Sequence, residues 1–66
     1  MDVVVLAEEL EVDNLVELST VYGNVAIRLT RVERRVNGIK FTGLNHQGTQ
    51  YCFGMKYGQS ATRLDM

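Results

Sequence analysis

Basic side chains gather in one short segment of the sequence, RVERRVNGIK, at residues 31–40. Guanidinium and ammonium groups bind phosphate oxygens, and aromatic side chains nearby can stack on bases, which is the combination that binds nucleotides and single strands. We therefore expect this segment to bind a phosphate-bearing ligand, either a nucleotide or a single-stranded nucleic acid. The candidate ligand-binding residues are Arg28, Arg31, Arg34, Arg35, Lys40, His46, Tyr51 and Tyr57.

The same basic segment has two other interpretations. It could be a solvated hairpin face, or it could contact an acidic protein surface. Residues 1–18 carry six carboxylates and no Lys or Arg, whereas residues 19–66 carry seven basic and two acidic side chains. Such a division along the chain matters more for a local field than the net charge of −1. The alternative function is therefore a protein–protein interaction module or inhibitor that acts as a homo-oligomer.

The single cysteine and the single histidine limit the chemistry that this chain can perform. Cys52 alone forms no intrachain disulfide, and Cys52 with His46 cannot supply the four ligands of a structural zinc site. No Asn or Asp is clearly placed to orient a Cys–His pair, and the glycines form neither a G-x-G-x-x-G nor a Walker pattern. We therefore expect no enzyme, no cofactor and no metal.

Length and composition indicate one small folded domain, residues 1–66. Hydrophobic residues make up 45% of the chain and charged residues 23%, as in folded soluble proteins. The lone thiol, the absence of a signal-peptide pattern and the absence of an 18-residue apolar run predict a cytoplasmic protein that does not contact a membrane. A short chain without catalytic groups is typical of the small binding proteins and inhibitors of mobile elements such as phages.

A chain of this size also has little core to stabilise it. Cores this small supply only about 3–5 kcal/mol, and natural chains usually add disulfides, a metal or a partner subunit. The apolar side chains of residues 3–6, 16–18 and 25–29, with those further along, exceed what one small domain can cover. We therefore expect a homo-oligomer, with a protein partner as a further possibility.

Alternating side chains predict the strands that must position the basic residues. Apolar and polar residues alternate with a period of two at residues 15–22, 25–29, 39–43 and 49–57, and a short last strand follows at residues 61–65. The N-terminal segment does not show this alternation clearly. Apolar side chains at helical spacing and the N-cap candidate Asp2 favour a helix from about residue 3 to residue 12, while the three consecutive valines favour a strand.

Irregular positions within these strands predict how the sheet bends. The phase of the alternation changes between Leu29 and Val32, which predicts a β-bulge near residues 30–31. Asn37 and Gly38 predict a two-residue type I′ hairpin turn, and Gly43 predicts a close approach of another backbone.

Together these elements predict an α+β, mostly β fold. An N-terminal helix is followed by a five-stranded antiparallel meander that forms a small SH3-like or Sm-like barrel or a strongly bent sheet; the alternative is an open sheet with the helix on one face. The eight residues VNGIKFTG resemble the turn-and-strand segment of the bacterial Sm-like RNA chaperones. Because the chain contains no YKH-like RNA-binding segment, we do not assign it to that family.

Overall fold

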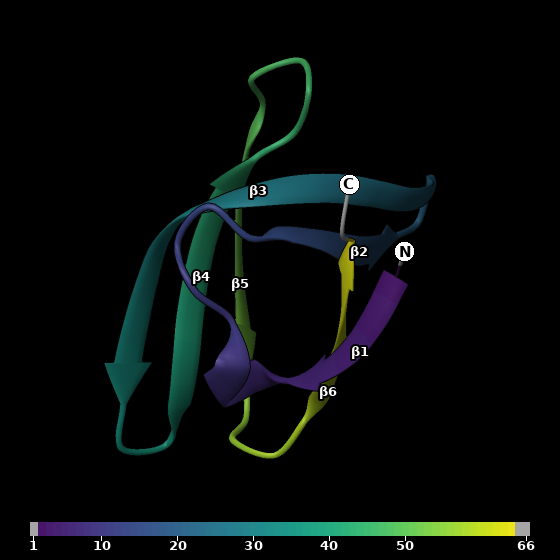
Figure 1. The fold of residues 1–66 in the computed structure, drawn as a ribbon. Helices are drawn as coiled ribbons and strands as arrows, with labels where there is room; N and C mark the ends of the chain where they lie inside the picture. Colours follow the sequence, from purple (N-terminus) through teal and green to yellow (C-terminus); the bar gives the residue numbers. More distant parts are fainter. Residues whose placement is uncertain (1, 65–66) are drawn as a thin grey trace.

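The computed structural model describes residues 2–64, which form a single antiparallel sheet (Figure 1). The strands are β1 (Asp2–Leu6), β2 (Leu15–Thr20), β3 (Gly23–Arg35), β4 (Gly38–Leu44), β5 (Gln50–Met55) and β6 (Ser60–Leu64). Their order across the sheet is β1-β6-β2-β3-β4-β5. The fold is therefore all-β.

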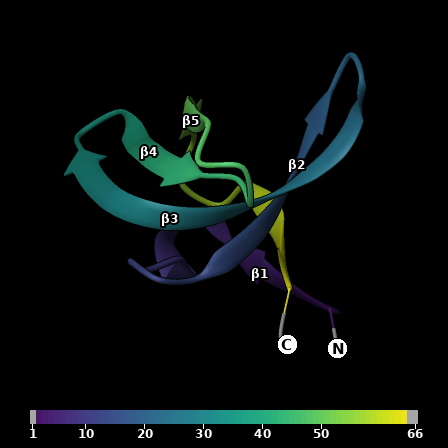
Figure 2. The same ribbon diagram turned by 90° about the horizontal axis from the view of Figure 1, so that it is seen from above.

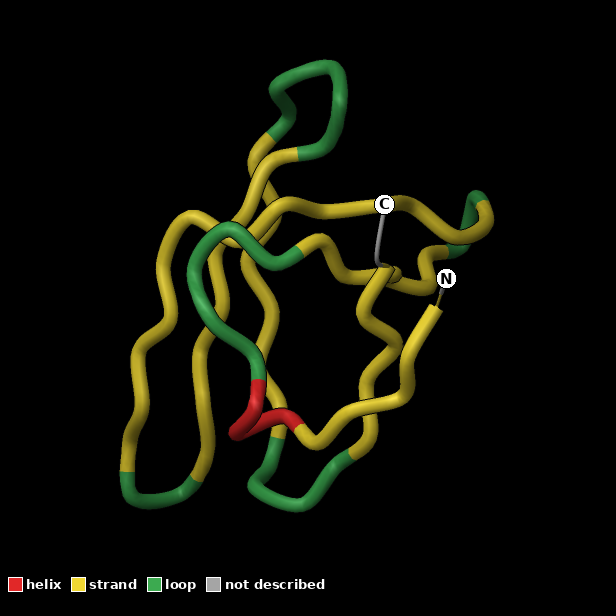
Figure 3. The backbone as a smooth tube through the Cα atoms, viewed as in Figure 1, coloured by secondary structure: helices red, strands yellow, loops and turns green. Residues whose placement is uncertain are grey.

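The predicted helix at residues 3–12 is wrong. Residues 2–6 form β1, which pairs with β6 at the far end of the chain, with Val3 opposite Arg63 and Val5 opposite Ala61. The helical element of the described residues is a single 3₁₀ turn, Ala7–Glu9 (red in Figure 3). The restricted χ1 of consecutive valines favours the extended form. Pairing with β6 stabilises the extended form further, and the spacing of nearby residues in the sequence does not predict this pairing.

The predicted five-stranded barrel is also wrong, because the sheet has six strands and remains open. After the β5–β6 turn the chain crosses over, and β6 enters between β1 and β2 instead of continuing a meander. The edges are therefore β1 and β5, and within residues 2–64 no strand ladder joins them.

The bend in β3 divides the sheet into two parts that enclose the core. The register between β3 and β4 shifts between Leu29 and Arg31, which confirms the predicted bulge. Figure 2 shows β3 as a long curved ribbon that reaches from β2 to β4. The first part of β3 pairs with β2 and its second part with β4, so the inner faces turn toward each other. The residues of the resulting core are Val5, Ala7, Leu10, Val16, Leu29, Ile39 and Phe41.

The β3–β4 hairpin forms, but its turn is one residue away from the predicted position. Arg35 pairs with Gly38, so the two loop residues are Val36 and Asn37. Neither has a positive φ, so the turn is not the predicted type I′ turn. Gly38 is needed for a different reason, because a Cβ at this position would lie 2.8 Å from the Met55 backbone oxygen of the neighbouring strand.

Gly38→Val is therefore expected to lower the free energy of unfolding by about 1–3 kcal/mol, the usual cost of forcing extra atoms into packed structure. Urea-induced unfolding followed by circular dichroism measures the difference. The control is Val36→Ala at the same hairpin tip, where the side chain is 95% exposed and the expected change is below about 0.5 kcal/mol. Equal stability of both variants would contradict the close approach of β5 to Gly38.

Candidate anion-binding groove

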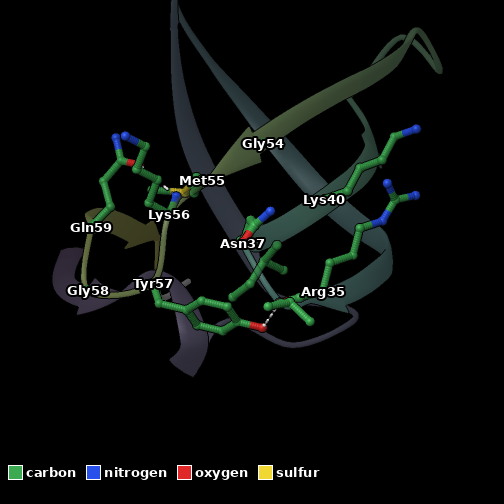
Figure 4. A pocket seen from close by; sticks show the side chains of 12 residues that line it. Arg35, Asn37, Lys40, Gly54, Met55, Lys56, Tyr57, Gly58 and Gln59 are labelled. Atoms are coloured by element: carbon green, nitrogen blue, oxygen red, sulfur yellow. Dashed lines mark hydrogen bonds between the residues drawn. The ribbon is translucent and has the colours of Figure 1, made fainter.

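A groove with a volume of about 1040 Å³ lies between the tip of the β3–β4 hairpin and the β5–β6 turn (Figure 4). Residues 35–40 line it on one side and residues 54–59 on the other. The charged lining residues, Arg35, Lys40 and Lys56, are all basic. This is the part of the predicted basic surface that the fold shapes into a concave site.

Hydrogen bonds hold the two sides of the groove in place. The Tyr57 hydroxyl donates to the Arg35 carbonyl oxygen at 2.6 Å, which joins the β5–β6 turn to the hairpin (Figure 4). Within the turn, the Gln59 side-chain oxygen accepts from the Lys56 N–H at 3.0 Å, and the Gln59 N–H donates to the Lys56 carbonyl at 3.1 Å. The groove is therefore preformed by contacts within the chain.

The acidic N-terminal segment supports the turn through Glu8. The Glu8 carboxylate accepts a hydrogen bond from the Gly58 N–H at 2.9 Å, and this bond lowers the pKa of Glu8. A carboxylate whose pKa is lower in the folded state than in the unfolded state stabilises the fold at pH values above its unfolded-state pKa. This stabilisation is lost as the pH falls through the folded-state pKa. Lowering the pH should therefore protonate Glu8 and weaken its hydrogen bond with the Gly58 N–H of the β5–β6 turn.

A basic face with one embedded carboxylate adjoins the groove on β3 and β4. Glu33 forms ion pairs with Arg31, at 3.1 Å, and with Arg35. The hydrogen bond from Arg35, and then the charges of Arg35, Arg31 and Lys40, lower the pKa of Glu33, so it stays ionised at neutral pH. Two of the four candidate arginines are thus partly neutralised before any ligand arrives.

The two lysines of the groove, Lys40 and Lys56, differ from Arg31 and Arg35 in their contacts. Neither the Lys40 nor the Lys56 ammonium makes a hydrogen bond or ion pair with another group in residues 2–64, although Lys40 adds to the field at Glu33. Both side chains are exposed; Figure 4 shows Lys40 on the hairpin side and Lys56 on the side of the β5–β6 turn, with their ends pointing away from each other. They are the lysines of the groove that no other group in residues 2–64 holds.

Two of the predicted arginines have structural partners instead. Arg28 Nη1 donates to the Asp13 carbonyl at 2.9 Å, and Arg34 Nη2 donates to the carbonyls of Glu8 and Leu10 at 3.1 and 3.3 Å. These bonds tie the segment between β1 and β2 to β3. The acidic segment thus contacts Arg34 through backbone oxygens, and neither Arg28 nor Arg34 lines the groove.

Among the other predicted residues, only Tyr57 joins the groove. His46 is exposed in the β4–β5 loop, which lies at the opposite end of β4 from the hairpin tip (Figure 1). Tyr51 pairs with the buried Gly43 and is half-buried. The prediction missed Lys56 and Gln59, because the folding of the β5–β6 turn against the hairpin leaves no periodic signal in the sequence.

Comparison with known proteins gives no family for this chain. No protein-family model matches it, and neither the curated proteins nor the solved structures contain a significant match. Within residues 2–64, no helix is long and apolar enough to cross a membrane, and no cluster of three or more His, Cys, Asp or Glu side chains could hold a metal ion. The geometry of the groove is therefore the basis for a functional proposal.

Proposed function

We propose that this protein is a non-enzymatic binding protein whose groove holds a small phosphate-bearing ligand, a nucleotide. The observation that carries the proposal is the pair of ammonium groups, Lys40 and Lys56, which make no hydrogen bond or ion pair within residues 2–64, in a groove whose charged lining residues are all basic. Charge-assisted hydrogen bonds to phosphate oxygens are shorter and stronger than neutral ones. The Arg35 guanidinium, held by Glu33, adds a third positive group at the hairpin side.

A groove with three basic side chains favours a nucleotide over a long nucleic acid strand. A track for an extended polyanion needs positive charges spaced along a surface, but Arg28 and Arg34 are bound to backbone oxygens outside the groove. The volume of about 1040 Å³ leaves room for a ligand of nucleotide size, since small-molecule sites commonly span roughly 300–1,000 Å³. Tyr57, which is 44% exposed, offers part of its ring for contact with a base.

Filling the groove should abolish nucleotide binding without unfolding the protein. Gly54 lines the groove, and a Cβ added there would meet nothing closer than the Ile39 carbonyl oxygen at 3.8 Å. Gly54→Leu should therefore fold normally and weaken the binding of ATP by at least about tenfold, or 1.4 kcal/mol. Isothermal titration calorimetry at low salt measures the affinity. The control is Gln50→Leu, which adds a leucine to the same strand outside the groove.

Two results of this titration would contradict nucleotide binding in the groove. Equal ATP affinity of Gly54→Leu and the native chain would place the ligand elsewhere and overturn the proposal. Binding of oligothymidylate but not of ATP, with a log–log salt slope of about −0.7 for each neutralised phosphate, would replace the nucleotide with a single-stranded nucleic acid.

A second candidate function, protein binding, is favoured by the tip of the β2–β3 hairpin. Val21 and Tyr22 at this tip are 93% and 97% exposed. Tyrosine is enriched at the energetic centres of protein interfaces, so an interaction module or inhibitor would use this hairpin. A folded protein that binds neither ATP nor oligonucleotide at low salt would favour this second function.

A further inference from the structure

Two residues of the 3₁₀ turn hold the β5–β6 turn, which lies beside it in Figure 3. The Ala7 N–H donates to the Gln59 carbonyl at 2.8 Å, and the Glu8 carboxylate accepts from the Gly58 N–H at 2.9 Å. Gly58 and Gln59 line the groove, whereas Ala7 and Glu8 do not. The 3₁₀ turn can therefore act on the groove through the two residues that it holds.

The contact with Gly58 fixes one particular peptide group of the β5–β6 turn. The Gln59 N–H donates to the Lys56 carbonyl at 3.1 Å, and Gly58 has a φ of 84°. A glycine with positive φ at the third position is typical of a type II turn, which differs from a type I turn in the orientation of its central peptide group. Here that group joins Tyr57 to Gly58, and in the other orientation the Tyr57 carbonyl oxygen would replace the N–H on the side of the Glu8 carboxylate. The Glu8 carboxylate therefore favours the type II turn.

The main chain of Glu8 is held by β3, the strand that leads into the hairpin side of the groove. Arg34 Nη2 donates to the Glu8 carbonyl oxygen at 3.1 Å. The hydrogen bonds of Glu8 with Arg34 and with Gly58 thus connect β3 to the β5–β6 turn. The hydrogen bond from the Tyr57 hydroxyl to the Arg35 carbonyl is a separate connection between the same two elements. Two neighbouring residues of β3 therefore hold the turn against the hairpin, one of them through Glu8.

We propose that Glu8 is a positioning residue for the groove, because it holds the β5–β6 turn in the conformation that binds the nucleotide. This inference rests on the proposed function, since it concerns the same site. A site that is already in its bound conformation loses less free energy to ordering when the ligand binds. Without the Glu8 acceptor, the apparent affinity should fall in proportion to the fraction of molecules whose turn stays in place.

The affinity of Glu8→Ala for ATP tests the proposal, because positioning and charge predict opposite effects. Removing a carboxylate beside a groove whose charged lining residues are basic would, by charge alone, tighten the binding of an anion. We expect instead that Kd for ATP rises about three- to tenfold, as when about a third to a tenth of the molecules keep the turn in place. Isothermal titration calorimetry measures the affinity, and circular dichroism should show that the variant keeps its fold, since Glu8 is exposed.

Two further variants serve as controls. Glu11→Ala removes the same charge from the same segment, but the Glu11 carboxylate makes no hydrogen bond or ion pair in residues 2–64, so Kd should stay unchanged or fall. Glu8→Gln keeps a side-chain oxygen that can accept from the Gly58 N–H, and it should bind ATP more tightly than Glu8→Ala. Equal or tighter binding of ATP by Glu8→Ala than by the native chain would overturn the positioning role.

Relaxation of the Gly58 amide nitrogen, measured by NMR without ATP, separates this inference from the proposed function. We expect the order parameter of this amide to fall in Glu8→Ala and to keep its native value in Glu11→Ala. If the native chain binds no ATP, the proposed function fails, and a lower order parameter in Glu8→Ala would still show that Glu8 positions the turn. Equal order parameters in the two variants would show that it does not.

Discussion

Gly43→Val is expected to lower the free energy of unfolding by about 3 kcal/mol, the upper part of the usual range for forcing atoms into a packed core. Gly43 is buried in β4, opposite Leu29, where β3 bends. A Cβ at this position would collide with the Ile27 side chain and would lie 2.7 Å from the Arg28 backbone oxygen. β4 cannot move away from β3 without breaking the backbone hydrogen bonds between the two strands, so the collision cannot be relieved at a small cost in free energy.

This loss is large for such a small protein. A core of this size supplies only about 3–5 kcal/mol, so the variant should be largely unfolded at 37 °C. Thermal and urea unfolding followed by circular dichroism measure the effect. The matched control is Gly54→Val on the neighbouring strand, where the nearest atom to an added Cβ is 3.8 Å away. If Gly43→Val unfolds at the same urea concentration as this control, the close packing of β3 and β4 is incorrect.

The double variant Lys40→Gln and Lys56→Gln is expected to weaken nucleotide binding by at least about a hundredfold. Each lysine is proposed to make one hydrogen bond between charged groups, worth about 1.5–3 kcal/mol, so the two together contribute at least about 3 kcal/mol, and about 2.7 kcal/mol already corresponds to a hundredfold change in Kd. Both side chains are exposed and lack partners in residues 2–64, so the free energy of unfolding should change by less than about 0.5 kcal/mol.

Arg28→Gln is the matched control for this double variant, because it also removes a positive charge but lies outside the groove. It should leave the affinity for ATP nearly unchanged, apart from a small effect of net charge. Arg31 and Arg35 would test the groove less sharply, since Glu33 already holds both guanidinium groups. Unchanged ATP affinity in the double lysine variant would show that the groove is not the binding site.

The sequence predicted the central strands because their signals are local. Alternating side chains identified β3, β4 and β5, and the change of phase after Leu29 located the bulge. Gly43 was correctly interpreted as a close approach of backbones, since a glycine in the interior of a strand often marks a position with no room for a side chain. The hairpin at Asn37 was found, although its two loop residues begin one position earlier than predicted.

The N-terminal strand and the complete groove could not be predicted in this way. β1 becomes a strand because β6, at the other end of the chain, pairs with it, and short-range spacing contains no record of that partner. The groove likewise depends on the β5–β6 turn folding against the hairpin, a contact made by Tyr57 with the Arg35 carbonyl. The sequence therefore indicated the basic hairpin but not Lys56, which completes the groove.

The most direct test of nucleotide binding in the groove is a titration of the isotope-labelled native chain with ATP at low salt, followed by backbone amide NMR. We predict saturable shifts that concentrate at Asn37, Gly38, Gly54 and Gly58, four lining residues from the two sides of the groove. The absence of shifts at millimolar ATP would contradict the proposed function, as would shifts that concentrate around His46 in the distant β4–β5 loop.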